Sequence, residues 1–196
     1  MAPRRRLTPE QRREQLLDVG TQLFAARPYA DVLMEDVAAR AGVSRALLYR
    51  HFPNKADLFA AIWRQRADRL LTTTALDSAT PLREYLSVAL DTHLDYYAAN
   101  KLTTLAANRE LSGDPAVQAV TSDLFVVLRQ RILDAPELAD HRRELVSAVV
   151  MGWLVFVRIL CMQWLENETF SRTALRDTCV NALLGGLGLP GFIGEP

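Results

Sequence analysis

A chain of 196 residues, of which 49% are hydrophobic and 23% charged, has the composition of a globular protein that can bury a core of its own. Its two cysteines, Cys161 and Cys179, lie far apart in apolar surroundings, which argues against a disulfide framework and against a zinc site. The charged N-terminal stretch has no apolar segment of the kind found in a secretory signal, so we expect a cytoplasmic protein.

The 23 basic and 23 acidic side chains cancel, but they are distributed unevenly. Residues 1–70 carry 13 basic and 8 acidic side chains, a net charge of +5, whereas residues 71–196 carry 10 and 15, a net charge of −5. A basic first part joined to an acidic second part predicts two functions, of which the first involves a polyanion.

The first helix signal lies near the N-terminus, and no segment has the alternation of a strand. Thr8 as N-cap, Pro9 at the first helical position and Gln11 form a capping box, and Pro28 ends the helix. Apolar residues recur along one face at helical spacing, which predicts their burial: Leu16, Leu17, Gly20, Leu23 and Phe24.

Three further helices are predicted in the first part of the chain, over residues 34–41, 45–51 and about 54–72. Gly42 follows the first of them where a left-handed backbone is favoured, Ser44 caps the second, and Pro53 ends it. The two short helices and the tight turn between them form a helix-turn-helix pattern, in which the second helix enters the major groove of DNA.

The rest of the chain predicts a larger helical domain without repeats. Its helices are expected from Pro81 towards Asn100, over residues 114–133 and 141–167, and from Ser171 to the glycines at 185–186. Residues 145–165 are almost all apolar and about as long as a membrane span. Because Arg158 lies within this run and no second span accompanies it, a helix buried in a core or in an oligomer interface is favoured.

Residues 37–59, with the sequence VAARAGVSRALLYRHFPNKADLF, resemble the DNA-binding domain of the tetracycline-repressor (TetR) family of bacterial transcriptional regulators. The family pattern is matched at Val37-Ala38, Ala41-Gly42-Val43-Ser44, Leu48-Tyr49-Arg50-His51-Phe52 and Lys55. The specific resemblance covers residues 10–60, about a quarter of the chain.

The resemblance implies an all-α protein with two domains. Residues 1–66 would form a three-helix helix-turn-helix DNA-binding domain, and residues 67–196 a larger helical domain for effector binding and dimerisation. The implied protein is a homodimer that binds an inverted-repeat operator in double-stranded DNA, acts as a repressor, and is released by a small-molecule effector of unknown identity. No cofactor, metal or membrane partner is implied.

The residues of the third predicted helix also support this interpretation physically. Leu48 and Phe52 are four apart and can face inward together, which leaves the other side of the helix outward. Ser44 and Lys55 stand at two helix N-termini, where the helix dipole favours an anion such as phosphate. The alternative is a solvated charged helix in a bundle.

By resemblance, Tyr49, His51 and Lys55 correspond to contacts with the DNA backbone, and residues 45–47 lie where bases are read. The predicted DNA-binding residues are Ser44, Arg45, Ala46, Leu47, Tyr49, Arg50, His51 and Lys55. Three N-terminal arginines form a candidate arm for the backbone or the minor groove, although such a run is equally typical of a disordered terminus: Arg4, Arg5 and Arg6.

Two residues depart from the family pattern. Leu33 stands where Ser or Thr is usual, and it can neither cap the second helix nor bond a phosphate. Pro28 replaces a common Gly after the first helix and cannot take a positive φ, so we expect that turn to differ.

The candidate effector-binding residues are polar or aromatic side chains in the apolar second part: His93, Tyr97, Asn100, Asn108, Trp153, Phe156, Arg158 and Trp164. Each has a structural alternative, as a satisfied core residue, an interface residue or solvated surface. Arg158 is costly to bury unless it pairs with a carboxylate of the protein or with an anionic ligand. The apolar residues of the last helix are expected to join residues 145–165 in a two-fold interface: Ala174, Leu175, Val180, Leu183 and Leu184.

Catalytic patterns are weak in this sequence. Asp91 and Asp95 share a helix face, but His93 points away from them, so the three do not converge. Glu137 and His141 supply two ligands, too few for a metal site. We therefore expect no enzyme. The second hypothesis is a small-molecule binding or sequestering helical protein with degenerate DNA binding, and the third is a helical enzyme.

Overall fold

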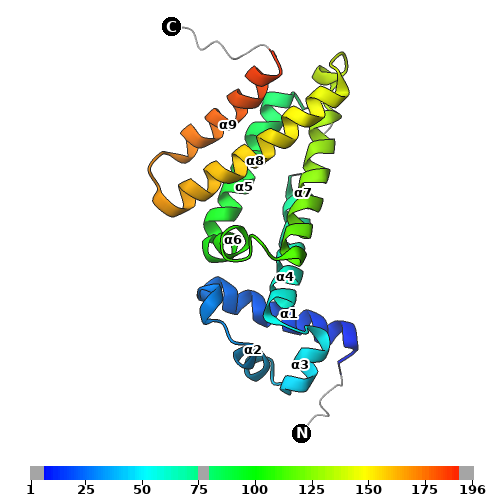
Figure 1. The fold of residues 1–196 in the computed structure, drawn as a ribbon, viewed down its shortest axis with the longest axis vertical. Helices are drawn as coiled ribbons and strands as arrows, with labels where there is room; N and C mark the ends of the chain where they lie inside the picture. Colours follow the sequence, from blue (N-terminus) through cyan, green and yellow to red (C-terminus); the bar gives the residue numbers. More distant parts are fainter. Residues whose placement is uncertain (1–6, 75–79, 190–196) are drawn as a thin grey trace. The chain divides into compact units, whose positions relative to one another are not determined.

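The computed structural model describes residues 7–74 and 80–189, and all regular structure in these residues is helical. Figure 1 shows the helices in chain order. Their bounds are α1 (Pro9–Ala26), η1 (Tyr29–Asp31), α2 (Met34–Ala41), α3 (Arg45–His51), α4 (Lys55–Thr73), α5 (Leu82–Ala99), α6 (Lys101–Asn108), α7 (Pro115–Leu133), η2 (Pro136–Leu138), α8 (Arg143–Asn167) and α9 (Arg172–Gly186). The all-α fold class is confirmed, and the eight predicted helices agree closely with the observed bounds. Helix α6 and the two 3₁₀ turns, η1 and η2, were not predicted.

The chain packs as two compact units. Unit 1 comprises the described residues up to Arg66 together with Asn100–Val120, and unit 2 comprises the rest. Helix α6 therefore belongs with the N-terminal helices, although it lies far from them in the sequence. The predicted functional division into residues 1–66 and 67–196 stays a prediction.

Unit 1 is organised around α1, whose predicted buried face is confirmed at all five positions. The capping box at Thr8 is present, with Oγ1 accepting from the backbone N–H of Gln11 and the Gln11 side chain accepting from that of Thr8. Gly20 allows close packing on α4, because a Cβ at this position would lie 2.8 Å from Cδ1 of Ile62. Phe24 packs edge-on against Phe59, with the ring centroids 5.2 Å apart.

Unit 2 is built from α5, α8 and α9, with the last turns of α4 and most of α7. Helices α8 and α9 lie side by side, shown in yellow and orange in Figure 1. The indole N–H of Trp153 on α8 donates to the backbone carbonyl of Cys179 on α9 at 2.7 Å, within the core. Arg172 on α9 forms ion pairs with Asp91 and Asp95 on α5, at 3.2 and 2.9 Å. These interactions fix α9 to both of its neighbours.

The prediction for the interface face of the last helix is wrong for four of its five residues. Leu175, Val180, Leu183 and Leu184 are buried in unit 2 itself and are not available to a partner. Only Ala174 is exposed. A 3.6-residue period shows that a helix has an apolar side, but it does not show whether that side meets the same chain or another one.

Helix α8 has two apolar sides. Val146, Val150 and Leu154 are buried, whereas the opposite side exposes four large apolar residues: Leu145, Val155, Phe156 and Ile159. It is the one helix among the described residues that is long and apolar enough to cross a membrane. Its buried side packs within unit 2, which is the arrangement of a core helix.

Candidate nucleic-acid interface and ligand cavity

The turn between α2 and α3 has the backbone that the sequence predicted. Gly42 closes α2 in the left-handed conformation, with φ 65° and ψ 37°. Ser44 then caps α3, its Oγ accepting from the backbone N–H of Leu47 at 3.2 Å. Both features are local, and together they begin α3 directly after the turn.

The two sides of α3 differ sharply in burial. Leu48 and Phe52 are 0% and 1% exposed, so they anchor the helix in unit 1. The outward side carries the residues predicted to contact DNA: Arg45, Ala46, Tyr49 and Arg50 are exposed, and Leu47 and His51 are half-buried. Tyr49 is 42% exposed.

Arg45 is not isolated on this surface. Its Nη1 lies 3.3 Å from Oε1 of Glu35 in the first turn of α2, although 70% of the Arg45 side chain remains exposed. Arg27 forms a similar pair with Asp36, at 3.0 Å. These exposed ion pairs are weak in water, so Glu35 can orient the guanidinium of Arg45 without preventing it from moving.

Lys55 is where the structure differs most from the sequence-based expectation. It begins α4, as predicted, but its ammonium group donates to the backbone carbonyls of Tyr29 at 2.8 Å and Ala30 at 3.3 Å. The same nitrogen lies 4.2 Å from the centroid of the Tyr29 ring. Two of its three donors are therefore used within unit 1, and the third has no carbonyl partner among the described residues.

The N-terminus of α4 is also capped by the protein. Oδ1 of Asn54 accepts from the backbone N–H of Asp57, and Nδ2 of Asn54 donates to the Asp57 carboxylate, both at 2.8 Å. The carboxylate of Asp57 already complements the helix dipole there. A phosphate at this position would therefore interact mainly with the side chain of Lys55 and less with the backbone N–H groups of the helix N-terminus.

Both departures from the family pattern have structural consequences. Leu33 is the N-cap of α2, makes no side-chain cap and is 55% exposed. Pro28 has a φ of −51° and precedes the 3₁₀ turn η1, so the backbone is not left-handed at this position. The carbonyls that Lys55 binds belong to this turn. The candidate arm, Arg4 to Arg6, lies outside the described residues.

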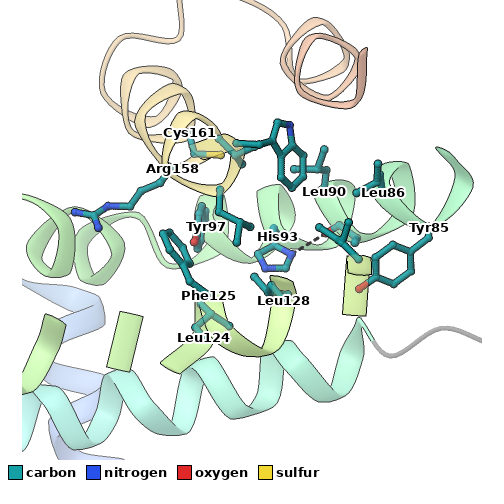
Figure 2. A pocket seen from close by; sticks show the side chains of 15 residues that line it. Tyr85, Leu86, Leu90, His93, Tyr97, Leu124, Phe125, Leu128, Arg158 and Cys161 are labelled. Carbon is teal, nitrogen blue, oxygen red and sulfur yellow. Dashed lines mark hydrogen bonds between the residues drawn. The ribbon is translucent and has the colours of Figure 1, made fainter. Parts of the chain in front are cut away.

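Unit 2 contains a cavity of about 60 Å³ between α5, α7 and α8. One water needs roughly 10–15 Å³, so the cavity has room for several waters or for a small organic group. Its wall is mostly apolar and is shown in Figure 2: Tyr85, Leu86, Ala89, Leu90, His93, Tyr97, Leu124, Phe125, Leu128, Ile132, Trp153, Leu154, Val157, Arg158 and Cys161.

Burial disfavours the charged forms of three polar groups in the lining, those of His93, Tyr97 and Cys161. Burial lowers the pKa of His93, the hydrogen bond to Ala89 opposes this effect, and the charge of Arg131 lowers the pKa further. Burial raises the pKa of the Tyr97 hydroxyl, and it raises that of the Cys161 thiol to about 12. Arg158 is half-buried at one end of the lining, and no carboxylate of the described residues forms a salt bridge with it.

The structure brings together four of the eight candidate effector residues. His93, Tyr97, Trp153 and Arg158 line the cavity. The other four do not: Asn100 accepts a hydrogen bond from Arg66, Asn108 donates to the carbonyl of Thr104, Phe156 is exposed, and Trp164 is half-buried outside the lining. Asn100 and Asn108 belong to unit 1.

The part of the cavity wall that α7 supplies was not predicted from the sequence. Leu124, Leu128 and Ile132 recur at four-residue spacing, and Phe125 lies beside them. This spacing predicts a buried face. It does not show that a cavity lies against that face.

The residues considered for catalysis are engaged elsewhere. Asp91 binds Arg172 and Arg176, while His93 on the other side of α5 faces the cavity, so the predicted divergence of Asp91 and His93 is confirmed. Glu137 accepts from the backbone N–H of Leu82 at 2.7 Å. Within residues 7–74 and 80–189, no group of three His, Cys, Asp or Glu residues is placed to hold a metal ion.

Known proteins resemble this chain in sequence and in fold. The family model of the bacterial regulatory proteins of the tetR family matches residues 16–62. The HTH-type transcriptional activator FasR of Mycolicibacterium smegmatis is 36% identical over 93 residues, which are 46% of this chain and 42% of FasR. The HTH-type transcriptional repressor Rv3405c of Mycobacterium tuberculosis is 30% identical over 149 residues, 76% of this chain and 68% of that protein.

A solved structure extends the likeness to the fold of nearly the whole chain. The tetR-family transcriptional regulator from Streptomyces coelicolor matches with a TM-score of 0.78 at 23% identity, over 93% of this chain and 82% of that one. The family model spans all of α2, the Gly42 turn and α3. The chain belongs to the TetR family of bacterial transcriptional regulators.

Proposed function

We propose that this TetR-family regulator is a cytoplasmic repressor that binds an inverted-repeat operator as a homodimer. We further propose that a small-molecule effector bound in the cavity of unit 2 releases it from DNA. The relatives differ in the sign of regulation, since FasR is named an activator and Rv3405c a repressor. Of these two relatives, the repressor Rv3405c is aligned over more of its own length than FasR.

The observation that carries the DNA-binding proposal is the outward side of α3. Arg45 can pair with the O6 and N7 edge of guanine, and Ala46 or Leu47 can contact a thymine methyl group. Tyr49, His51 and the remaining donor of Lys55 can reach phosphate oxygens. Leu48 and Phe52 anchor the helix from its buried side. A helix anchored in this way, with outward polar and basic side chains, suits the major groove.

The exposed side of α8 supports the homodimer. Leu145, Val155 and Ile159 are 62%, 46% and 53% exposed, and Phe156 lies beside them. A contiguous apolar patch on one helix face is typical of a subunit interface. In a two-fold dimer, this patch on one subunit would pack against the same patch on the other subunit. One helix face would therefore supply both sides of the interface.

The dimer can be tested with Ile159→Glu, which places a charge within the patch. We expect sedimentation velocity to show a monomer, or a dimer at least tenfold weaker, because an interface core excludes unpaired charge. Val126→Glu is the matched control, since Val126 on α7 is 51% exposed and lies outside the patch. Equal dimerisation of the two variants would contradict the proposed interface.

The DNA-binding proposal is tested by selecting genomic fragments with the purified protein, followed by footprinting. We expect a protected inverted repeat whose half-sites are one helical turn, about 34 Å, or a multiple apart. Specific affinity should fall near 10⁻⁸ to 10⁻¹¹ M at physiological salt, roughly 10³ to 10⁷ times tighter than non-specific binding.

A second function is favoured by one observation. Leu33 offers no cap and no phosphate donor, and two donors of Lys55 are used internally. Fewer backbone contacts would leave a small-molecule binding protein with degenerate DNA binding. Weak protection spread evenly over any duplex would support this second function and contradict the first.

A further inference from the structure

The wall of the cavity in unit 2 carries a buried polar atom without a partner. Nε2 of His93 is inaccessible to solvent, and it forms no hydrogen bond with any described residue. Figure 2 shows the His93 ring in the middle of the cavity, between Leu90 on one side and Leu128 on the other, with Tyr97 beside it. The ring centroids of His93 and Tyr97 are 6.2 Å apart in an edge-on arrangement.

The other ring nitrogen determines which protons the imidazole carries. Nδ1 lies 2.8 Å from the carbonyl oxygen of Ala89, drawn as a dashed line in Figure 2. A carbonyl oxygen only accepts, so Nδ1 must carry a proton. In the neutral ring Nε2 then has a lone pair and is an acceptor. The charged ring, with a proton on both nitrogens, is disfavoured by burial and by the charge of Arg131.

The rest of the cavity wall limits which ligands can donate a hydrogen bond to Nε2 of His93. Leu86, Leu90, Leu124 and Leu128 offer no polar atoms, so the ligand must be mainly apolar where it contacts them. The Tyr97 hydroxyl and the Cys161 thiol stay protonated, so neither adds a charge. Arg158, the cation in the lining, is half-buried and points away from His93 in Figure 2. The inner cavity is therefore neutral and lacks a hydrogen-bond donor at Nε2.

We infer that the cavity binds a small neutral ligand with an apolar body and one O–H or N–H donor, a phenol, alcohol or amide, which donates to Nε2 of His93. This inference rests on the proposed function only in treating the cavity as the effector site. An anionic ligand would have to leave its charge at Arg158, away from the unpaired acceptor. A ligand without a donor would leave the buried Nε2 unpaired, which is costly. The cavity should therefore select ligands that carry a donor.

The test uses four probes with the full-length protein, without DNA. 4-Methylphenol carries the donor, toluene and 4-methylanisole are smaller and larger analogues without it, and 4-methylbenzoate is the anion. We expect 4-methylphenol to bind roughly 5- to 150-fold more tightly than either analogue, the range that corresponds to one satisfied buried acceptor. Titration calorimetry or ligand-observed NMR measures these affinities.

His93→Phe keeps a planar ring of similar size and removes the acceptor. We expect this variant to bind all three neutral probes with similar affinity. His141→Phe is the matched control, because His141 does not line this cavity, and it should keep the preference. The chain has three histidines, so the ¹⁵N signal of His93 Nε2 can be assigned by its loss in the variant, and it should shift only with 4-methylphenol.

Three results would overturn the inference. They are equal affinities for the neutral probes in the wild type, tightest binding of 4-methylbenzoate, and no binding of any probe. Thermal unfolding of His93→Phe shows whether the variant is folded. If it is not folded, the affinities and ¹⁵N shifts of the wild type still test the inference. The ligand measurements contain no DNA. Failure to find an operator would therefore contradict the proposed DNA binding and leave this inference intact, and failure of the ligand series would leave the proposed DNA binding intact.

Discussion

Lys55→Met separates two contributions that one side chain can make to DNA binding. Met keeps most of the apolar stem of Lys55 and removes the ammonium group, which binds the carbonyls of Tyr29 and Ala30 and lies over the Tyr29 ring. A hydrogen bond from a charged donor contributes roughly 1.5–3 kcal/mol, and a cation–π contact at a partly exposed site about 0.5–1 kcal/mol. Because Lys55 is only half-buried, we expect a net loss of about 1–3 kcal/mol of unfolding free energy, or roughly 2–12 °C in Tm.

Arg50→Met is the matched control for charge. Arg50 is exposed on the same surface, and neither a hydrogen bond nor an ion pair to another described residue is found for it. Both variants lose one positive charge, so both should reduce long-range attraction to DNA to a similar degree. Only Lys55→Met should lower Tm appreciably.

The salt dependence of DNA binding then shows whether Lys55 also contacts a phosphate. Each lost phosphate contact reduces the slope of log K against log salt concentration by about 0.9. A smaller slope with uniform loss over all sequences would assign the third donor of Lys55 to a phosphate. Weaker binding with an unchanged slope would mean that Lys55 only positions the turn η1. If Lys55→Met unfolds at the same temperature as Arg50→Met, the argument from the carbonyl contacts is refuted.

The remaining predictions concern Arg45, Leu33 and His93. Arg45→Ala should relax base preference at one position in each half-site, at a cost of about 1–3 kcal/mol, and equal loss on specific and random DNA would contradict a base contact. Leu33→Thr supplies the missing cap of α2 and should raise the unfolding free energy by about 0.5–1 kcal/mol in urea titrations; no gain would mean that the α2 N-terminus is satisfied otherwise. The pKa of His93 is lowered by burial, so the unfolded chain binds more protons as pH falls below about 6.5, and stability should decrease there. His93→Phe should remove this component from the pH dependence of urea unfolding, and an unchanged profile would contradict it.

The sequence by itself determined the features that depend on neighbours three or four residues apart. The capping box at Thr8, the left-handed Gly42 and the cap at Ser44 are hydrogen-bonding arrangements within one turn of chain, so residue types and their spacing are sufficient to predict them. The burial of Leu48 and Phe52 followed from helical periodicity. The resemblance to the family includes Gly42, Ser44, Leu48 and Phe52, and the family match confirmed it.

Tertiary structure alone decided the features that join distant residues. The ammonium of Lys55 meets a carbonyl 26 residues away, and Arg45 meets Glu35 from another helix. His93, Leu128 and Arg158 come from three helices and line one cavity, whereas Asn100 and Asn108 belong to the other unit. Periodicity shows that Leu183 lies on an apolar side of α9, but only packing shows that this side is buried in its own chain. Local propensity depends on the residue and its near neighbours, whereas contacts between helices depend on how every helix in the unit packs.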